Sequence, residues 1–162
     1  MEIAAYTGSF DPITLGHLNV IERSARFVNR LVIGIGVNSE KQGLFSPQER
    51  QDLVERVTAK LPNIEVRQFE GLAVDFVKAC GAKVMIRGVR PLTDIAAEFT
   101  MMMANRQLNE ELETVFLMAD GEFSHVSSTL IKQIAPLAND EQLARFVPLS
   151  IIPDLRRKIK SV

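Results

Sequence analysis

The chain has 162 residues, of which 46% are hydrophobic and 24% charged, a composition typical of one globular domain with its own core. Its net charge of −1 lacks the basic excess of a nucleic-acid-binding surface, and no apolar run approaches the length of a membrane span. The single cysteine, Cys80, cannot form an internal disulfide and the N-terminus has no signal-peptide pattern, so we expect a cytoplasmic protein.

Apolar and amphipathic segments alternate along the chain in the order of β-α-β units. The predicted strands cover residues 2–6, 31–37, 64–68, 84–86 and 114–118. The predicted helices cover residues 17–27, a segment that starts after an N-cap at Ser46, and residues 73–80, 94–108, 127–135 and about 153–161. This order predicts one Rossmann-like α/β domain over residues 1–162, doubly wound, with a parallel five-stranded sheet and helices on both faces. In such folds ligands bind beyond the carboxyl ends of the strands.

The loop after the first predicted strand, residues 8–17, holds the most specific pattern of the chain. Gly8 permits the close approach of another group, and Gly16 and His17 stand where the next helix begins. Amide groups at a helix start favour anions, and a histidine beside them can donate a hydrogen bond to a phosphoryl oxygen as charge builds there. The alternative is that the glycines only shape the loop and that His17 only opens the helix.

Two further strand-end segments hold cations suited to phosphate. Lys41 follows the second predicted strand, where a lysine can act as a mobile charge or can simply be a surface residue. Arg87 and Arg90 follow the fourth predicted strand and could form a fork for an anion. The alternative for these arginines is an ion pair with Asp94 or Glu98, but their place at the expected ligand edge favours phosphate binding.

The segment after the fifth predicted strand, residues 123–129, ends in hydroxyl side chains at a helix start. Ser127 and Ser128 could cap that helix, or their hydroxyls and the nearby amides could bind a nucleotide phosphate. His125 lies just before them, where a loop histidine without a special role is the simpler interpretation. Cys80 follows apolar residues, so we interpret it as a buried small hydrophobe and not as a reactive thiol.

Three of these segments resemble the motifs of one superfamily. Residues 8–17 are similar to the G-[ST]-F-D-P-x-T-x-G-H signature of the nucleotidyltransferases, with the T-x-G-H ending found in pantetheine-phosphate adenylyltransferases. Residues 87–90 resemble the R-G-[LV]-R motif of that family, and residues 126–129 resemble its [IV]-S-S-[ST] motif. The chain is therefore identified as a member of this family by resemblance.

The resemblance extends over nearly the whole chain, from Tyr6 to the region around Phe146, with two departures. Residues 95–97 read Ile-Ala-Ala, where many members of the family have an aromatic-acidic-aromatic stretch, and Glu98 is what remains of that cluster. Thr129 stands in place of a third serine and keeps the hydroxyl. The first departure affects details of the adenine pocket or of a subunit contact, and not the reaction.

The resemblance implies a reversible transfer of the adenylyl group from ATP to 4′-phosphopantetheine, which gives dephospho-coenzyme A and pyrophosphate. Mg²⁺ is expected to arrive with ATP, because we find no cage of carboxylates that would form a metal site of the protein itself. The family also implies a homo-oligomer, a hexamer, with neither nucleic acid nor membrane as a partner.

The resemblance assigns roles to individual residues as well. His17 and Lys41 would act in catalysis, His17 by stabilising the transition state. The acceptor would contact Ser9, Lys41, Ala73 and Arg87. The nucleotide would contact Ser9, Phe10, His17, Gly88, Val89, Arg90, Glu98, Phe123, Ser124, His125, Val126, Ser127, Ser128 and Thr129.

Other functions remain as alternatives. The nearest is another small-molecule adenylyl- or cytidylyltransferase of the same superfamily, and a non-catalytic nucleotide sensor on the same fold is a more distant one. The joint presence of His17, Lys41 and two arginines argues against a sensor. A dinucleotide-dependent oxidoreductase is weaker still, because the first loop lacks G-x-G-x-x-G.

Overall fold

The computed structural model describes residues 3–38, 40, 42–90 and 95–160 of the chain. Its parallel strands are β1 (Ile3–Gly8), β2 (Arg30–Gly36), β3 (Ile64–Phe69), β4 (Val84–Val89) and β5 (Glu113–Met118). Its helices are α1 (Leu15–Ala25), α2 (Pro47–Thr58), α3 (Ala73–Ala79), α4 (Ile95–Leu108), α5 (Ser128–Ile134), α6 (Asp140–Leu143) and α7 (Ile152–Lys160), with the 3-10 helices η1 (Gly121–Phe123) and η2 (Leu149–Ile151). The strands form one five-stranded sheet in the order β3-β2-β1-β4-β5. The predicted doubly wound α/β fold is therefore confirmed.

Local capping signals set the starts of several helices. The Ser46 hydroxyl accepts the Glu49 amide of α2 at 3.2 Å and the Glu49 carboxylate accepts the Ser46 amide at 2.8 Å, which is the predicted capping box. Helix α1 begins at residue 15 and not at residue 17, because Thr14 caps it. Helix α6 was not predicted, since four residues are too few to show a helical period. Asn139 and Gln142 nevertheless form a capping box at its start.

Strand β4 is longer than predicted. It continues to Val89, so Arg87 and Gly88 lie in the strand and not in a loop after it. The arginine and the glycine interrupt the apolar run in the sequence and hide the rest of the strand. Glycine is needed here, because a β-carbon at Gly88 would lie 2.8 Å from the Tyr6 hydroxyl and 3.2 Å from Val20. The hydrogen-bonded ladder with β5 thus holds Arg87 in a rigid element.

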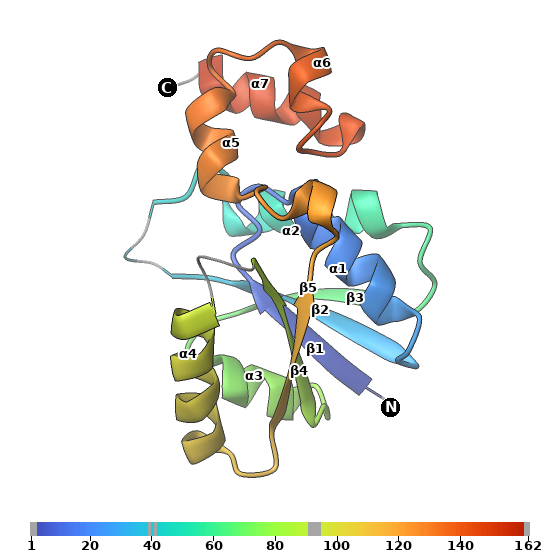
Figure 1. The fold of residues 1–162 in the computed structure, drawn as a ribbon, viewed down its shortest axis with the longest axis vertical. Coiled ribbons are helices and arrows are strands. Elements are labelled where there is room, and N and C mark those ends of the chain that lie inside the picture. Colours follow the sequence, from blue (N-terminus) through green and yellow to red (C-terminus); the bar gives the residue numbers. More distant parts are fainter. Residues whose placement is uncertain (1–2, 39, 41, 91–94, 161–162) are drawn as a thin grey trace.

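An apolar core covers each face of the sheet. The larger core packs strand residues against α1, α2, α5, α6 and α7, and the smaller core packs them against α3. Cys80 is buried in the smaller core, as predicted, and burial raises the pKa of its thiol. Helix α4 lies on the same side as α3, with the Asn105 amide nitrogen 3.7 Å from the Met85 sulfur. Helices α5, α6 and α7 gather at the end of the molecule that β5 points toward, at the top of Figure 1.

The strand order reverses between β1 and β4. The chain first builds outward from β1 through β2 to β3, and it then returns to place β4 and β5 on the other side of β1. Loops that leave the carboxyl ends of β1 and β4 therefore diverge, which opens a crevice for ligands at this point. No helix in the described part of the chain is long and apolar enough to cross a membrane.

Candidate active site

A cavity of about 300 Å³ opens at the carboxyl ends of β1 and β4, between α1 and the start of α5. It collects residues that are far apart in the sequence and that the family motifs single out. Of the residues predicted to contact ATP, those that line it are Ser9, His17, Gly88, Val89, Arg90, Glu98, Phe123, Val126, Ser127, Ser128 and Thr129. The structure thus brings most of the predicted nucleotide site together at the crevice between β1 and β4.

A second cavity, of about 450 Å³, adjoins the first. It includes Ala73, which was predicted to contact the acceptor, and apolar side chains such as Leu72 and Met101. The two cavities share the residues Thr7, Gly8, Ser9, Arg87 and Glu98. Two ligands that occupied the two cavities would therefore meet beside these shared residues.

Three residues predicted to contact ATP do not line the first cavity. Phe10 is 1% exposed as a whole residue and packs in the larger core. The His125 ring packs edge-on against Phe146, with ring centroids 5.9 Å apart. The Ser124 hydroxyl donates to the carbonyl of Gly121 at 2.9 Å, within the turn of η1. Lys41 lies outside the described residues.

His17 occupies the third position of α1, with its ring held by the N-cap residue. The Thr14 amide donates to Nδ1 of His17 at 3.1 Å, and the Thr14 hydroxyl lies 3.0 Å from the same nitrogen. Because Nδ1 accepts the amide hydrogen, the neutral ring carries its proton on Nε2. The ring is also tilted against Phe10, with centroids 5.0 Å apart, which limits its rotation. His17 therefore both belongs to the helix start and is available as a donor in the cavity that it lines.

The charge state of His17 follows from its surroundings. Burial, together with the positive charges of Arg90 and Arg87, lowers the pKa of His17 from 6.5 to about 4. The imidazole is therefore neutral at physiological pH. A neutral imidazole with Nε2–H can donate a hydrogen bond to a phosphoryl oxygen without first having to lose or gain a proton.

Arg87 forms a two-pronged ion pair with Glu98 of α4. Its Nε and Nη2 lie 2.8 Å and 2.6 Å from the two carboxylate oxygens, and its Nη1 donates to the Thr7 carbonyl at 2.6 Å. The ion pair with Glu98 that the sequence left as an alternative is therefore present, while Asp94 lies outside the described residues. The pair stands on the boundary between the two cavities, so it can orient Arg87 toward a ligand in either of them. Arg90 follows on the rim of the first cavity.

Both serines at the start of α5 have partners within the protein. The Ser127 hydroxyl accepts the Leu130 amide at 3.1 Å and caps the helix, as one of the two sequence interpretations had it. The Ser128 hydroxyl donates to the carbonyl of Pro12 at 2.8 Å and so links α5 to the first loop. Both residues, with Thr129, still line the first cavity. These two hydrogen bonds therefore hold the start of α5 beside the first cavity, where a ligand can still reach it.

Asp11 holds the first loop in place, a role that sequence reasoning missed. Its carboxylate is buried and accepts the amides of Leu44 and Phe45 at 2.9 Å and 2.8 Å, and Lys132 of α5 lies 2.6 Å away. A β-carbon at Gly43 would come within 3.1 Å of this carboxylate. Asp11 thus joins the first loop to the segment after β2 and to α5, although the partners are 33 to 121 residues distant. The one signal in the sequence was the Asp-Pro turn, which indicates a turn but not its partners.

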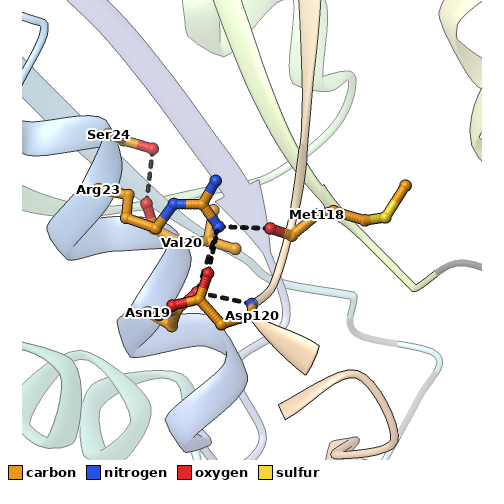
Figure 2. A network of polar contacts seen from close by, with 6 residues as sticks. All are labelled: Asn19, Val20, Arg23, Ser24, Met118 and Asp120. Atoms are coloured by element: carbon orange, nitrogen blue, oxygen red, sulfur yellow. Dashed lines mark hydrogen bonds and ion pairs between the residues drawn. The ribbon is translucent and has the colours of Figure 1, made fainter. Parts of the chain in front are cut away.

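A second polar network fastens α1 to the end of β5. Figure 2 shows Arg23 and Asn19 of α1 reaching Asp120. The Arg23 guanidinium donates to the Met118 carbonyl at 2.5 Å and to the Asp120 carboxylate at 3.1 Å, while the Asn19 amide donates to Asp120 at 2.8 Å. This network holds the chain just before Phe123, a residue that lines the cavity.

Comparisons with known proteins agree with this geometry. Residues 5–134 match the family model described as cytidylyltransferase-like. A phosphopantetheine adenylyltransferase of Rhodopirellula baltica is 63% identical over 97% of this chain and 88% of its own length, and one of Clostridium botulinum strain Hall is 44% identical over 98% and 96%. Among solved structures, a nicotinic acid mononucleotide adenylyltransferase of Plasmodium falciparum complexed with NaAD superposes with a TM-score of 0.72 over 98% of this chain and 95% of that chain. It is only 13% identical, so this likeness supports the fold alone.

The match in sequence and the assembly of the signature residues around one crevice lead to the same assignment. The family model covers β1 to α5, which are the elements that bound the first cavity. The relatives match over almost the whole chain, so the likeness is not limited to a motif. The chain belongs to the phosphopantetheine adenylyltransferase family, within the cytidylyltransferase-like nucleotidyltransferases.

Proposed function

We infer that this protein transfers the adenylyl group of ATP to 4′-phosphopantetheine, releasing pyrophosphate and forming dephospho-coenzyme A, a step of coenzyme A biosynthesis. The observation that carries the inference is the pair of cavities that meet at Ser9, Arg87 and Glu98, in a chain 63% identical to a phosphopantetheine adenylyltransferase. ATP would occupy the first cavity and the acceptor the second, so that the acceptor phosphate approaches the α-phosphorus where the cavities join.

The reaction needs positioning more than acid–base chemistry. An oxygen of the acceptor phosphate attacks the α-phosphorus, and the bond from that phosphorus to the bridging oxygen of pyrophosphate breaks. Because the acceptor phosphate is already ionised, no strong general base is required, and catalysis rests on alignment and on stabilising charge. His17 would donate Nε2–H to an α-phosphoryl oxygen in the transition state. Arg87 and Ser9 would hold the acceptor phosphate, and Arg90 the phosphates of ATP.

Two further participants belong to this proposal. Lys41 would neutralise the acceptor phosphate from the segment after β2. ATP would enter as its Mg²⁺ complex, and Mg²⁺ would supply charge neutralisation on the phosphates. In the part of the chain that the structure describes, no group of three or more His, Cys, Asp or Glu side chains could hold a metal ion.

Substrate use tests the proposed function directly. Purified protein with Mg²⁺ and ATP should release pyrophosphate only when 4′-phosphopantetheine is added, because the acceptor supplies the attacking oxygen. Pyrophosphate release can be followed by a coupled assay, with nicotinamide mononucleotide as a rival acceptor and CTP as a rival donor. Equal turnover with nicotinamide mononucleotide, or with CTP, would show that the chain serves a different transferase reaction of the superfamily.

Assembly into a closed homo-oligomer, a hexamer, is part of the same proposal. Helix α4 and the edge strand β5 carry a group of exposed apolar side chains: Ile95, Phe99, Met101, Met103, Leu108, Phe116 and Met118. An apolar patch of this kind on a soluble chain marks an interaction surface, and an edge strand is a further site for pairing. A second copy of the chain would cover it in a symmetric oligomer.

Light scattering at low micromolar concentration is therefore expected to give a mass several times 18.1 kDa. Replacing Phe99, which is 53% exposed, by aspartate should shift the mass toward the monomer, since a charge would be buried without a partner. A monomeric wild-type protein under these conditions would exclude the proposed assembly.

A further inference from the structure

Arg50 is a buried cation near the site that the mechanism above does not use. It lies on α2, is 7% exposed, and donates from Nη1 to the carbonyl of Ser9 at 2.9 Å and to the carbonyl of Gly36 at 3.1 Å. Ser9 directly follows β1 and Gly36 ends β2. One side chain thus ties together the carboxyl ends of two neighbouring strands at the edge where the cavities open.

The charge of Arg50 has no carboxylate partner among the described residues. Its hydrogen bonds go to two carbonyls, and its Nε is buried without a hydrogen-bond partner in that part of the chain. Other arginines of the described chain, such as Arg56 on the same helix, reach a carboxylate instead. Burying a guanidinium without a counter-ion costs stability, which an apolar residue at this position would not. Within the described residues, the positive charge of Arg50 therefore has no carboxylate beside it, and it lies next to the Ser9 carbonyl.

The grip on the Ser9 carbonyl also determines where the next amide points. The peptide between Ser9 and Phe10 is trans, so its N–H is directed opposite to its carbonyl. The carbonyl is turned toward Arg50, so the Phe10 amide points away from that side chain. Ser9 itself lines both cavities. Phe10 has a φ of 49°, in the left-handed region that a side chain adopts only at a cost. Such a backbone conformation persists only when contacts with the surrounding structure stabilise it.

We propose that Arg50 is a positioning residue for the nucleotide: by holding the Ser9 carbonyl it fixes the Ser9–Phe10 peptide, and it so keeps Ser9 in place where the two cavities meet. That the ligand beside Ser9 is a nucleotide rests on the proposed adenylyl transfer. Arg50 acts through the peptide and does not itself touch the substrate. Its role therefore differs from that of Arg87 and Arg90, which line the first cavity.

Selective labelling makes the proposal measurable on the whole protein. The chain has nine phenylalanines, so ¹⁵N-phenylalanine labelling gives a small set of amide signals. The Phe10 signal is assigned by its loss in the Phe10→Leu variant. ATP with Mg²⁺ is then titrated without acceptor into the wild type, Arg50→Met, Arg50→Lys and the control Arg56→Met. Arg56 belongs to the same helix, has a side chain 45% exposed and pairs with Asp154.

In the wild type and in Arg56→Met, ATP is expected to shift the Phe10 signal. Arg50→Met should lose this shift and should bind ATP about tenfold more weakly, because the Ser9–Phe10 peptide is no longer held in place; such a loss is typical of one hydrogen bond. Arg50→Lys keeps the charge but presents a compact ammonium in place of a planar fork, so it should bind ATP with an affinity between those of Arg50→Met and the wild type. Thermal melting of the same variants is the check. If Arg50 only supports the fold, the loss of ATP affinity in each variant should follow its loss of melting temperature.

Several results would overturn the proposal. It is wrong if Phe10 shifts equally in Arg50→Met and in the wild type, or if Arg56→Met weakens ATP binding as much. If Arg50→Met does not fold, the test rests on Arg50→Lys. An Arg50→Lys variant that binds ATP as tightly as the wild type would refute the requirement for the guanidinium. The wild-type protein separates this proposal from the proposed function. If its Phe10 signal shifts with ATP but it does not adenylylate phosphopantetheine, the proposed function is wrong and the role of Arg50 stands. If it adenylylates phosphopantetheine but its Phe10 signal does not shift with ATP, only the role of Arg50 is wrong.

Discussion

Replacing His17 by alanine is expected to lower kcat by about 10²- to 10³-fold while changing the KM for ATP far less. The Thr14 amide occupies Nδ1, so the neutral ring presents Nε2–H in the cavity where the α-phosphate would lie. A donor placed for the transition state strengthens its contact as the new bond to phosphorus forms, and it contributes less to binding of the ground state. Steady-state kinetics and thermal melting on the same preparation separate a catalytic from a structural role.

His17→Gln is the matched variant for this experiment, because its side-chain amide can still donate a hydrogen bond at a similar reach. We expect it to recover part of the kcat that His17→Ala loses. Near-normal kcat in His17→Ala would remove His17 from the mechanism. A melting temperature so low that the enzyme is unfolded in the assay would assign the lost activity to the fold instead.

The pH dependence of the reaction gives an independent view of His17. Its pKa is about 4 in the folded protein, against 6.5 for an ordinary histidine. Titration of His17 should therefore produce no inflection in kcat between pH 6 and 8, as expected of a neutral donor. The unfolded chain binds a proton near pH 6.5 and the folded protein only near pH 4. Acidification through that interval should therefore destabilise the folded state, and His17→Gln should lack this component.

Replacing Asp11 by alanine is expected to be the most destabilising change in the first loop, by roughly 2–4 kcal/mol in the free energy of unfolding. The substitution leaves the buried Phe45 amide and the Leu44 amide without their acceptor and removes the partner of Lys132. The two amides account for most of the loss, since the Lys132 side chain is 41% exposed and water screens its charge. Urea unfolding measures the effect, at one protein concentration for all variants because the proposed assembly would add to stability.

Two control variants separate the contributions around Asp11. Asp11→Asn keeps one acceptor oxygen for the amides and should lose less stability than Asp11→Ala. Lys132→Met removes only the cation and should cost less than about 1 kcal/mol. If Lys132→Met were as destabilising as Asp11→Ala, the ion pair and not the pair of amide hydrogen bonds would hold the first loop to the segment after β2.

Most of the secondary structure can be read from local patterns. Most strands contain a short apolar run and α2 carries its own capping box, so these elements follow from neighbouring residues. The location of the site follows as well, because the carboxyl ends of parallel strands share one edge of the sheet. Several of the motif residues, among them His17, Arg90 and Thr129, do line one cavity there. What these predictions share is that each depends on residues within a few positions of one another.

Contacts between distant segments could not be predicted in this way. The Asp11 carboxylate binds amides of the segment after β2 and a lysine of α5. Arg50 binds carbonyls at the ends of β1 and β2. The sequence around these two residues does not indicate either set of partners. The sequence left open whether Arg87 binds an anion or pairs with Glu98, and the packing of α4 brings Glu98 against it. Strand β4 was predicted only to residue 86, because Arg87 and Gly88 interrupt its apolar run. Local periodicity records which face of an element is buried. Which charge meets which carbonyl depends on how the elements pack, and packing joins residues that the chain separates by a hundred positions or more.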